Sequence, residues 1–273
     1  MKNEIGGIKS KSRKLLANLL KATQESFTVS QAMIALGINR TKTISLLSLW
    51  TKNGWLHRIK RGLYIGVPLQ STNTKITPTE PWLIAQHLFS PYYIGGWSAA
   101  HHWGFTEQLF NTEFVITTRK VHQRDLNFDG VRFKIKTVTK DKLFGMKFIW
   151  SGNNKIAISD PTKTIVDGLN DPAIFGGVRM LADILHVYID SKQFNFEKFL
   201  AYATQMNNSA IFKRLGFLLE LLTNKKSIDI LINACRAQIK MGYSQLDPST
   251  PGKRLVTRWN LWVPQKNWKT PRD

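Results

Sequence analysis

The chain has little cysteine, little acidic charge and no long hydrophobic run. Its 273 residues include a single cysteine, Cys235, so no disulfide can form within the chain and no cysteine-based zinc site is expected. No stretch reaches the roughly 18 apolar residues of a membrane-spanning helix. The N-terminal sequence MKNEIGGIKSKSRK lacks the apolar segment of a signal peptide. We therefore expect a cytoplasmic protein that does not insert into a membrane.

Sequence motifs of several enzyme classes are also missing. The chain contains no GxxxxGK[ST] phosphate-binding loop, no GxSxG nucleophile elbow and no HExxH metal motif. A metal-dependent nuclease holds Mg²⁺ with clustered carboxylates, whereas the expected strands offer Glu113 alone. We expect a protein that is not an enzyme and that holds no metal or cofactor.

Basic residues greatly outnumber acidic ones. Lys and Arg number 39 against 18 Asp and Glu, which gives a net charge of +21. Residues 1–67 hold 12 of the cations against Glu4 and Glu25, a net +10. Neutralising the phosphates of nucleic acid requires such an excess. An anionic membrane surface would instead call for a basic amphipathic helix, and the cations here are spread over many elements. Composition therefore favours nucleic acid as the partner.

Residues 27–67 have the pattern of two helices joined by a tight turn and followed by a hairpin. Ser30 is placed to cap the first helix, Gly37 ends it, and Asn39 is placed to cap the second. The apolar residues expected to face the core are Met33, Ile34, Leu36, Ile44, Leu47 and Trp50. This order of elements is typical of a winged helix-turn-helix, in which the second helix enters the DNA major groove.

The polar side chains of this segment are the expected DNA contacts. Short hydroxyls and long cations lie near the start of the second helix, and the hairpin over residues 55–67 turns at Lys60, Arg61 and Gly62. The predicted contacts are Arg40, Lys42, Thr43, Ser45, Arg58, Lys60 and Arg61. The alternative interpretation is a small helical core with a solvated basic face.

The sequence predicts an α+β protein of two domains. The N-terminal winged helix-turn-helix spans residues 1–67, and a linker rich in turn formers and hydroxyls follows at 68–78. A mixed domain with a small sheet and a helical layer then spans residues 79–273. Its expected strands are 114–118, 131–138, 146–150 and 155–159, and helices follow from Asp160 onward.

Two features of the second domain leave alternatives open. Arg132, Lys134 and Lys136 alternate with apolar residues along one expected strand. They indicate either an edge strand protected by charge or a contact with nucleic acid or an acidic partner. His101 and His102 are adjacent and do not form the one-face pair of a metal site. We expect one of these rings to pack with Trp97 and Trp103.

The order of motifs resembles the AbiEi-type antitoxins of bacterial type IV toxin-antitoxin, or abortive-infection, systems, which serve in phage defence. The motifs that carry the resemblance are RGLYIGVP, YYIGGWSAAHHWGFTEQ, ISDPTKTIVDGLNDPAIFGG, FKRLGFLLELL, LDP and RWNLWV, between residues 27 and 263. The resemblance implies a transcriptional autorepressor that binds its own promoter. It also implies that the C-terminal domain counteracts a nucleotidyltransferase-like toxin, without needing a stable complex with that toxin.

The resemblance further highlights motif members in the second domain. They are Trp97, His101, Asp160, Lys163, Asp167, Arg214, Arg258 and Trp259. A helix cap with a surface ion pair is one explanation for Asp160, Lys163 and Asp167, and an interaction role is the other. We expect binding to an inverted repeat in double-stranded DNA, as a monomer or weak dimer. A stand-alone winged-helix regulator and a nuclease-like DNA-processing protein of a mobile element are the alternative functions.

Overall fold

The computed structural model describes residues 10–23, 26–67, 81–128, 130–151, 154–222 and 228–264. The predicted linker at 68–78 and the side chain of Lys60 lie outside the described residues. The fold is a mixed α+β structure in which helices accompany three small sheets. Contacts divide the chain into two compact units. The first comprises residues 1–84 with 127–132 and 150–155, and the second comprises the rest.

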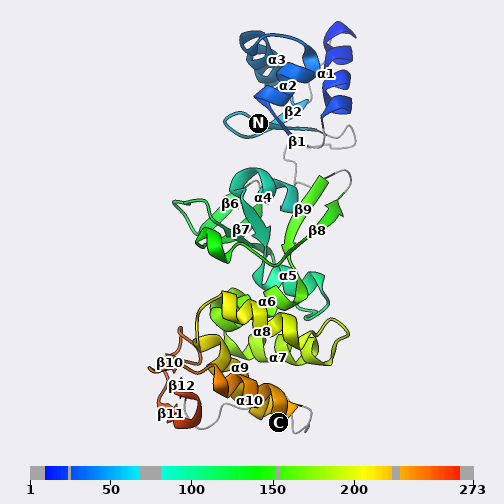
Figure 1. Ribbon diagram of the computed structural model, residues 1–273. Helices are drawn as coiled ribbons and strands as arrows, with labels where there is room; N and C mark the ends of the chain where they lie inside the picture. Colours follow the sequence, from blue (N-terminus) through cyan, green and yellow to red (C-terminus); the bar gives the residue numbers. More distant parts are fainter. Residues whose placement is uncertain are drawn as a thin grey trace. The chain divides into compact units, whose positions relative to one another are not determined.

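The first unit contains three helices and a small antiparallel sheet (Figure 1). Its helices are α1 (Ser10–Ala22), α2 (Val29–Leu36) and α3 (Arg40–Lys52), and its strands are β1 (Ser26–Thr28), β2 (Leu56–Lys60) and β3 (Leu63–Gly66). The strand order is β1-β3-β2. Helix α1 was not predicted from the sequence. It contributes Leu16 and Leu19 to a core with Phe27, Leu47 and Trp50.

The two helix starts of this unit differ in how well the sequence predicted them. Asn39 caps α3 as predicted, because its Oδ1 accepts a hydrogen bond from the backbone N–H of Lys42 at 2.9 Å. The prediction for Ser30 was wrong. Thr28 caps α2 and forms a capping box with Gln31, so that the helix begins before Ser30. Gly37 ends α2 in the left-handed conformation (φ 63°).

The inward face of α3 also differs from the prediction. Thr43, Leu47 and Trp50 are its buried residues, whereas Ile44 is 43% exposed. Leu47 and Trp50 therefore face the core as predicted, and Thr43 takes the place predicted for Ile44, because a threonine can turn its hydroxyl to the helix backbone and bury its methyl group. Ile34 of α2 was likewise predicted to face the core and is 83% exposed.

A six-stranded sheet has the order β6-β7-β5-β4-β9-β8. Its strands are β4 (Tyr92–Ile94), β5 (Thr112–Thr117), β6 (Asp125–Phe128), β7 (Val131–Thr137), β8 (Met146–Ser151) and β9 (Asn154–Ser159). The four predicted strands correspond to β5, β7, β8 and β9. The central strand β4 was missed, since its three residues are buried on both faces and show no alternation. It pairs antiparallel with β5 and parallel with β9.

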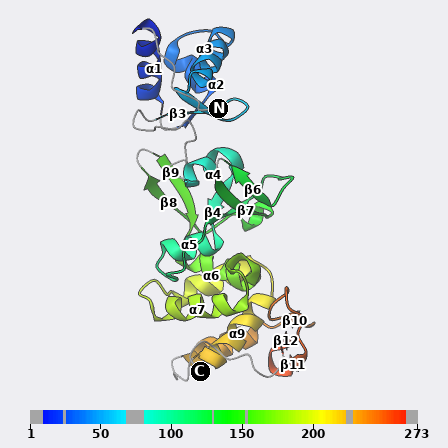
Figure 2. The same cartoon turned by 180° about the vertical axis from the view of Figure 1, so that it is seen from behind.

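Helices follow the sheet along the chain, as predicted. The helices of the second part of the chain are α4 (Pro81–Phe89), α5 (Gly96–His102), α6 (Pro161–Asn170), α7 (Val178–Asp190), α8 (Phe196–Gln205), α9 (Ala210–Leu222) and α10 (Asp229–Ala237), with 3-10 turns η1 (Lys140–Lys142), η2 (Pro172–Phe175) and η4 (Thr257–Trp259). A small sheet of order β10-β12-β11 comprises β10 (Ser244–Gln245), β11 (Arg254–Val256) and β12 (Leu261–Val263). Figures 1 and 2 show α6 to α10 gathered at one end of strands β4, β5 and β9. In the part of the chain that the structure describes, none of the helices has the length and hydrophobicity needed to cross a bilayer.

A close approach between α9 and η4 fixes the C-terminal segment against the helices. Trp259 is completely buried, and its indole N–H donates a hydrogen bond to Glu220 of α9 at 2.9 Å. Its ring lies over Gly216, where an added Cβ would meet the ring atom Cη2 at 2.0 Å. Only a glycine leaves room for the indole at this position of α9.

We predict that Gly216→Ala destabilises the second unit by about 1–3 kcal/mol, because the new methyl group forces the Trp259 ring out of its place. This loss exceeds the gain of about 1 kcal/mol that alanine brings to a helix interior. Thermal unfolding followed by circular dichroism measures the difference. The double variant Gly216→Ala with Trp259→Leu is the control, and equal effects of Gly216→Ala in both backgrounds would contradict the proposed clash.

Candidate nucleic-acid interface

The first half of α3 presents an exposed cationic surface. Arg40 and Lys42 in its first turn are exposed, and Ser45 lies exposed one turn further on. The Ser45 hydroxyl donates to the carbonyl of Thr41 at 3.1 Å, which keeps it close to the helix backbone. These three predicted residues are accessible to a partner, and the cations lie at the positive end of the helix dipole, where anions are stabilised.

Thr43 is placed differently from the prediction. Its side chain is 0% exposed, and its hydroxyl donates to the carbonyl of Asn39 at 2.9 Å. A buried side chain with its donor already used cannot read a base edge, so Thr43 belongs to the core of this unit. Exposed Thr41, next to Arg40, offers a hydroxyl on the accessible surface in its place.

The β2–β3 hairpin carries the other predicted cations. Arg58 and Arg61 are exposed, and the pairing register shifts between Arg58 and Lys60, which marks a bulge that twists the strand. The turn contains Gly62 in the left-handed conformation (φ 86°). The Gly62 carbonyl accepts a hydrogen bond from the N–H of Val29 at 3.2 Å, so the turn is fixed to the start of α2.

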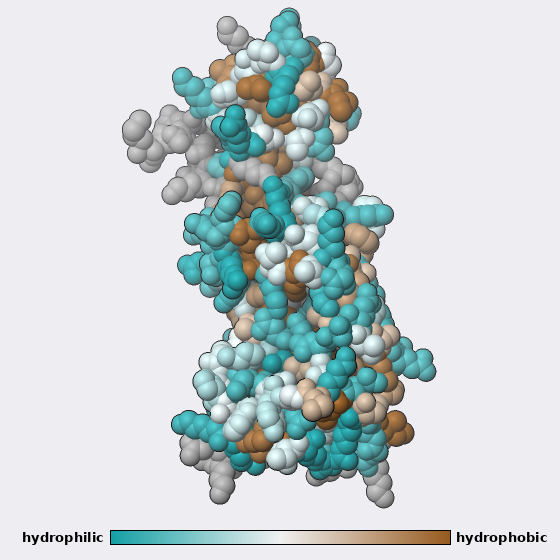
Figure 3. Space-filling model, turned by 60° about the vertical axis from the view of Figure 1, so that its left-hand side comes forward, coloured by the Kyte–Doolittle hydropathy of each residue, from teal (hydrophilic) through white to brown (hydrophobic). Residues whose placement is uncertain are grey.

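Acidic residues are missing from the chain around this surface. Between Ser26 and Thr79 the sequence contains no Asp or Glu. A carboxylate partner for the cations of α3 and of the hairpin would therefore have to come from another part of the chain. Figure 3 shows one face of the molecule, on which hydrophilic side chains predominate and hydrophobic ones lie in small groups.

In the second unit, Asp160, Lys163 and Asp167 form a buried cluster. Asp160 caps α6 as predicted, accepting from the N–H of Lys163 at 2.9 Å. The expected surface ion pair is instead buried, because the Lys163 side chain is 0% exposed where its ammonium pairs with Asp167. The ammonium also donates to the hydroxyl of Tyr93 at 3.1 Å and lies 4.6 Å from the centre of the Phe144 ring.

The partners of this cluster come from other elements and were not predicted. Tyr93 of β4 donates its hydroxyl to Asp167 at 2.8 Å, and burial together with the Asp167 charge raises the Tyr93 pKa well above its usual value. Tyr202 and Lys198 of α8 donate to Asp160 at 3.0 and 2.8 Å. Every charged group in the cluster is paired within the chain, as a structural network requires.

Arg214, Arg258 and Trp259 have structural partners as well. Arg214 is buried, and its guanidinium donates to the carbonyls of Leu169 (2.6 Å) and Asn170 (3.0 Å) at the end of α6 and to that of Gln245. Burial lowers its pKa to about 10, so it remains a cation at neutral pH. Arg258 pairs with Glu220 at 3.1 Å, and Glu220 also accepts from Trp259.

The tryptophan and the two histidines of α5 have different surroundings. Trp97 is buried, donates its indole N–H to the carbonyl of Thr112 at 2.6 Å and stacks on Phe110. His101 is exposed. His102 contacts the edge of Trp103, as expected for one of the two rings, and burial and the neighbouring His101 lower its pKa. Among the described residues, no three His, Cys, Asp or Glu side chains are arranged to hold a metal ion.

The cationic row on β7 is exposed only in part. Arg132 and Lys134 are exposed, whereas Lys136 is half-buried and pairs with Asp171 at 2.5 Å. The ammonium of Lys134 lies 5.9 Å from the centre of the Trp97 ring. The edge-strand interpretation was wrong, because β7 lies between β6 and β5 in the sheet. Protection of a free edge therefore does not account for these cations.

We predict that Lys163→Met destabilises the protein by about 3–5 kcal/mol, because it leaves the Asp167 carboxylate buried without its counter-ion. The double variant Lys163→Met with Asp167→Leu should recover most of that loss, since it removes both charges together. Chemical denaturation measures both variants, with Lys140→Met at an exposed position as the control. A double variant no more stable than Lys163→Met would contradict the account.

Comparisons with known proteins show a shared fold and no family. No family model matches the chain, and no curated protein matches it. Among solved structures, the chain is similar to the RV2827C protein from Mycobacterium tuberculosis, with a TM-score of 0.65 and 13% sequence identity. The similarity covers 94% of this chain and 92% of that chain. At such low identity the likeness extends to the fold alone.

Proposed function

We propose that the protein is a DNA-binding transcriptional repressor whose first unit is a winged helix-turn-helix. The observation that carries the proposal is the exposed cationic first turn of α3, within a stretch of chain that contains no acidic residue. In this interpretation α2 and α3 are the two helices of the motif, Gly37 forms the turn between them, and the β2–β3 hairpin is the wing.

The accessible side chains suit contacts with duplex DNA. Arg40 and Lys42 carry charges that long side chains can bring to phosphates or to base edges, while Thr41 and Ser45 add hydroxyls on the same stretch of helix. The exposed cations Arg58 and Arg61 of the hairpin would reach the backbone beside the groove. The fixed Gly62 turn supports this role, since an anchored hairpin loses less conformational freedom when it binds.

The site that such a protein recognises would be an inverted repeat in the promoter of its own gene. Two copies, binding as separate monomers or as a weak dimer, then occupy two half-sites whose spacing matches the helical repeat of DNA. The motifs that resemble AbiEi-type antitoxins support a second role, in which the C-terminal part counteracts a nucleotidyltransferase-like toxin. The buried clusters around Lys163 and Arg214 would serve this role through the fold that they hold, because their polar groups are paired within the chain.

We predict that Arg40→Ala and Arg61→Ala each weaken binding to the promoter duplex by about tenfold or more, because each removes a cationic contact to the DNA. Band-shift titration with DNA from upstream of the gene measures the affinity. Lys253→Ala, which removes the same charge from an exposed position in the second unit, is the matched control. Unchanged affinity in both α3 and hairpin variants would refute the assigned interface.

The dependence of DNA affinity on salt concentration tests the same interface independently. If about six phosphates are neutralised, affinity should fall about a thousandfold between 50 and 200 mM salt, because binding releases the counterions condensed on DNA. Arg40→Ala should reduce the slope of log affinity against log salt by about one if Arg40 contacts a phosphate. Binding that is insensitive to salt would contradict the electrostatic basis of the proposal.

The antitoxin role is tested by co-expression with the product of the adjacent gene from an unrelated promoter. We expect the protein to relieve the growth arrest caused by that product, and the Arg40→Ala, Arg61→Ala double variant to relieve it equally, since this role is assigned to the second unit. Growth arrest that persists with the wild-type protein present would reject the antitoxin role and leave the repressor.

A further inference from the structure

Helix α3 exposes an isoleucine among its polar side chains. Ile44 is 43% exposed. Three hydroxyl-bearing residues are also exposed on this part of the helix, Thr41, Ser45 and Ser48. Positions three and four residues apart lie on one face of a helix, so these four side chains form one outward stripe. The stripe starts beside Arg40, the first residue of α3, and belongs to the surface proposed to contact DNA.

The core of the first unit is complete without this isoleucine. The buried residues of α3 are Thr43, Leu47 and Trp50, and Thr43 holds the inward position that the apolar pattern predicted for Ile44. A single exposed apolar residue is ordinary on a protein surface. Ile44 differs from that ordinary case because it lies among cations and hydroxyls at the start of α3. An apolar side chain in water gains free energy when an apolar group of a partner covers it.

The backbone that carries Ile44 is held in place before any partner binds. Asn39 caps α3 by accepting from the N–H of Lys42 at 2.9 Å, and the Thr43 hydroxyl donates to the Asn39 carbonyl at 2.9 Å. A β-branched side chain in a helix also strongly prefers one χ1 rotamer. Ile44 therefore loses little conformational freedom when it contacts a partner, which favours a specific contact.

The major groove of DNA offers a matching apolar group on one base. Thymine presents its 5-methyl group there, whereas the other characteristic groups of the groove are hydrogen-bond donors and acceptors. Cytosine lacks the methyl group, and a purine presents polar atoms that would lose water against Ile44 without gaining a hydrogen bond. The hydroxyls of Thr41 and Ser45 can bond to donors or to acceptors and so discriminate less between bases. Ile44 is the residue of the stripe whose chemistry selects one base.

We propose that Ile44 determines sequence specificity by packing against the 5-methyl group of a thymine in the major groove. The inference rests on the proposed DNA-binding function, because it requires the start of α3 to enter the groove. It goes beyond that function by naming the group on the DNA that one residue recognises. Arg40 and Lys42 attract any duplex through its phosphates, whereas Ile44 distinguishes a site with this thymine from a site without it.

Deoxyuridine tests the contact, because it pairs as thymine does and lacks only the methyl group. Band-shift titrations of the full-length protein compare the promoter duplex with duplexes in which each thymine is replaced in turn. For the wild type, we expect one replacement within a half-site to weaken binding about fourfold, the effect of one buried methyl group. Ile44→Ala should weaken binding to the unmodified duplex by at least as much. It should also abolish the effect of that replacement, since both changes remove the same contact.

Leu49→Ala is the matched control. Leu49 is 48% exposed on the same helix, and it lies about 7.5 Å beyond Ile44 along the helix axis. This variant should keep the full effect of the deoxyuridine replacement. Alanine favours the helix, so both variants should remain folded, and circular dichroism verifies this.

The possible outcomes separate this inference from the DNA-binding proposal. Salt-sensitive binding by the wild type that no deoxyuridine replacement weakens overturns the thymine contact and leaves the repressor. An Ile44→Ala variant that binds as the wild type does, or that keeps the effect of the replacement, overturns it as well. If Ile44→Ala weakens binding to all duplexes equally and lowers the mass of the complex in sedimentation, Ile44 contacts a second copy of the chain instead. No binding of the promoter duplex by the wild type overturns both proposals.

Discussion

The buried pair of Lys163 and Asp167 is the interaction on which the second unit depends. An ammonium with no exposed surface is stable only if its charge and its donors are satisfied, and the groups that satisfy them come from separate elements. Tyr93, which accepts a hydrogen bond from the ammonium, lies on the central strand β4. Phe144, whose ring contacts the ammonium, lies in the segment before β8. The need to pair one buried charge therefore fixes the sheet and helix α6 to each other.

The first unit differs, because the chain between Ser26 and Thr79 contains no acidic residue. Its stability comes from an apolar core around Leu19, Phe27, Leu47 and Trp50. In the second unit, by contrast, Arg214, Lys136 and Arg258 all hold chain segments together. This contrast is consistent with the proposed role of the first unit.

The sequence predicted elements whose signals are local and failed where tertiary contacts decide. Helix α8 (Phe196–Gln205) lies in the region after Asp160 where helices were predicted, and its start is set by the local cap at Asn195. Periodicity alone placed Ile44 inward, whereas the structure buries Thr43, whose hydroxyl bonds to its own helix. Lys163 was predicted at the surface because its spacing from Asp167 fits an exposed pair equally well. Its burial depends on Tyr93, which lies 70 residues away in the chain.

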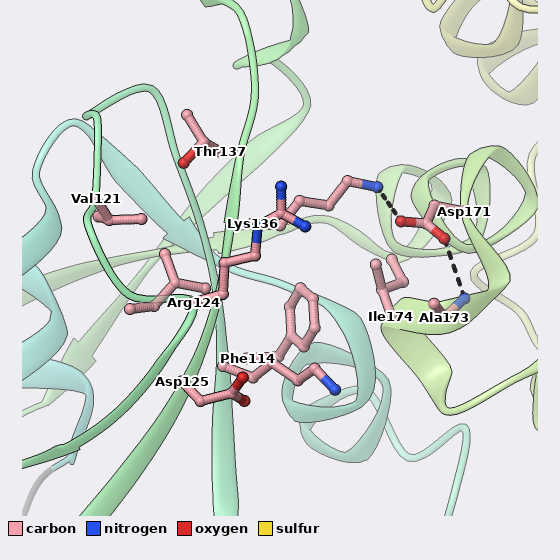
Figure 4. A pocket seen from close by; sticks show the side chains of 11 residues that line it. Phe114, Val121, Arg124, Asp125, Lys136, Thr137, Asp171, Ala173 and Ile174 are labelled. Carbon is pink, nitrogen blue, oxygen red and sulfur yellow. Dashed lines mark hydrogen bonds and ion pairs between the residues drawn. The ribbon is translucent and has the colours of Figure 1, made fainter. Parts of the chain in front are cut away.

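Helix α6 links these observations, since both its ends are held by charged groups. Asp160 caps the start of α6 and accepts hydrogen bonds from Lys198 and Tyr202. At the end of the helix, Arg214 donates hydrogen bonds to the carbonyls of Leu169 and Asn170. Asp171, the next residue, caps η2 and pairs with Lys136 of strand β7 (Figure 4). The Lys136–Asp171 pair therefore joins strand β7 to the junction between α6 and η2. Because α6 is buried along most of its length and charged groups hold both of its ends, this helix connects the sheet to the helical layer.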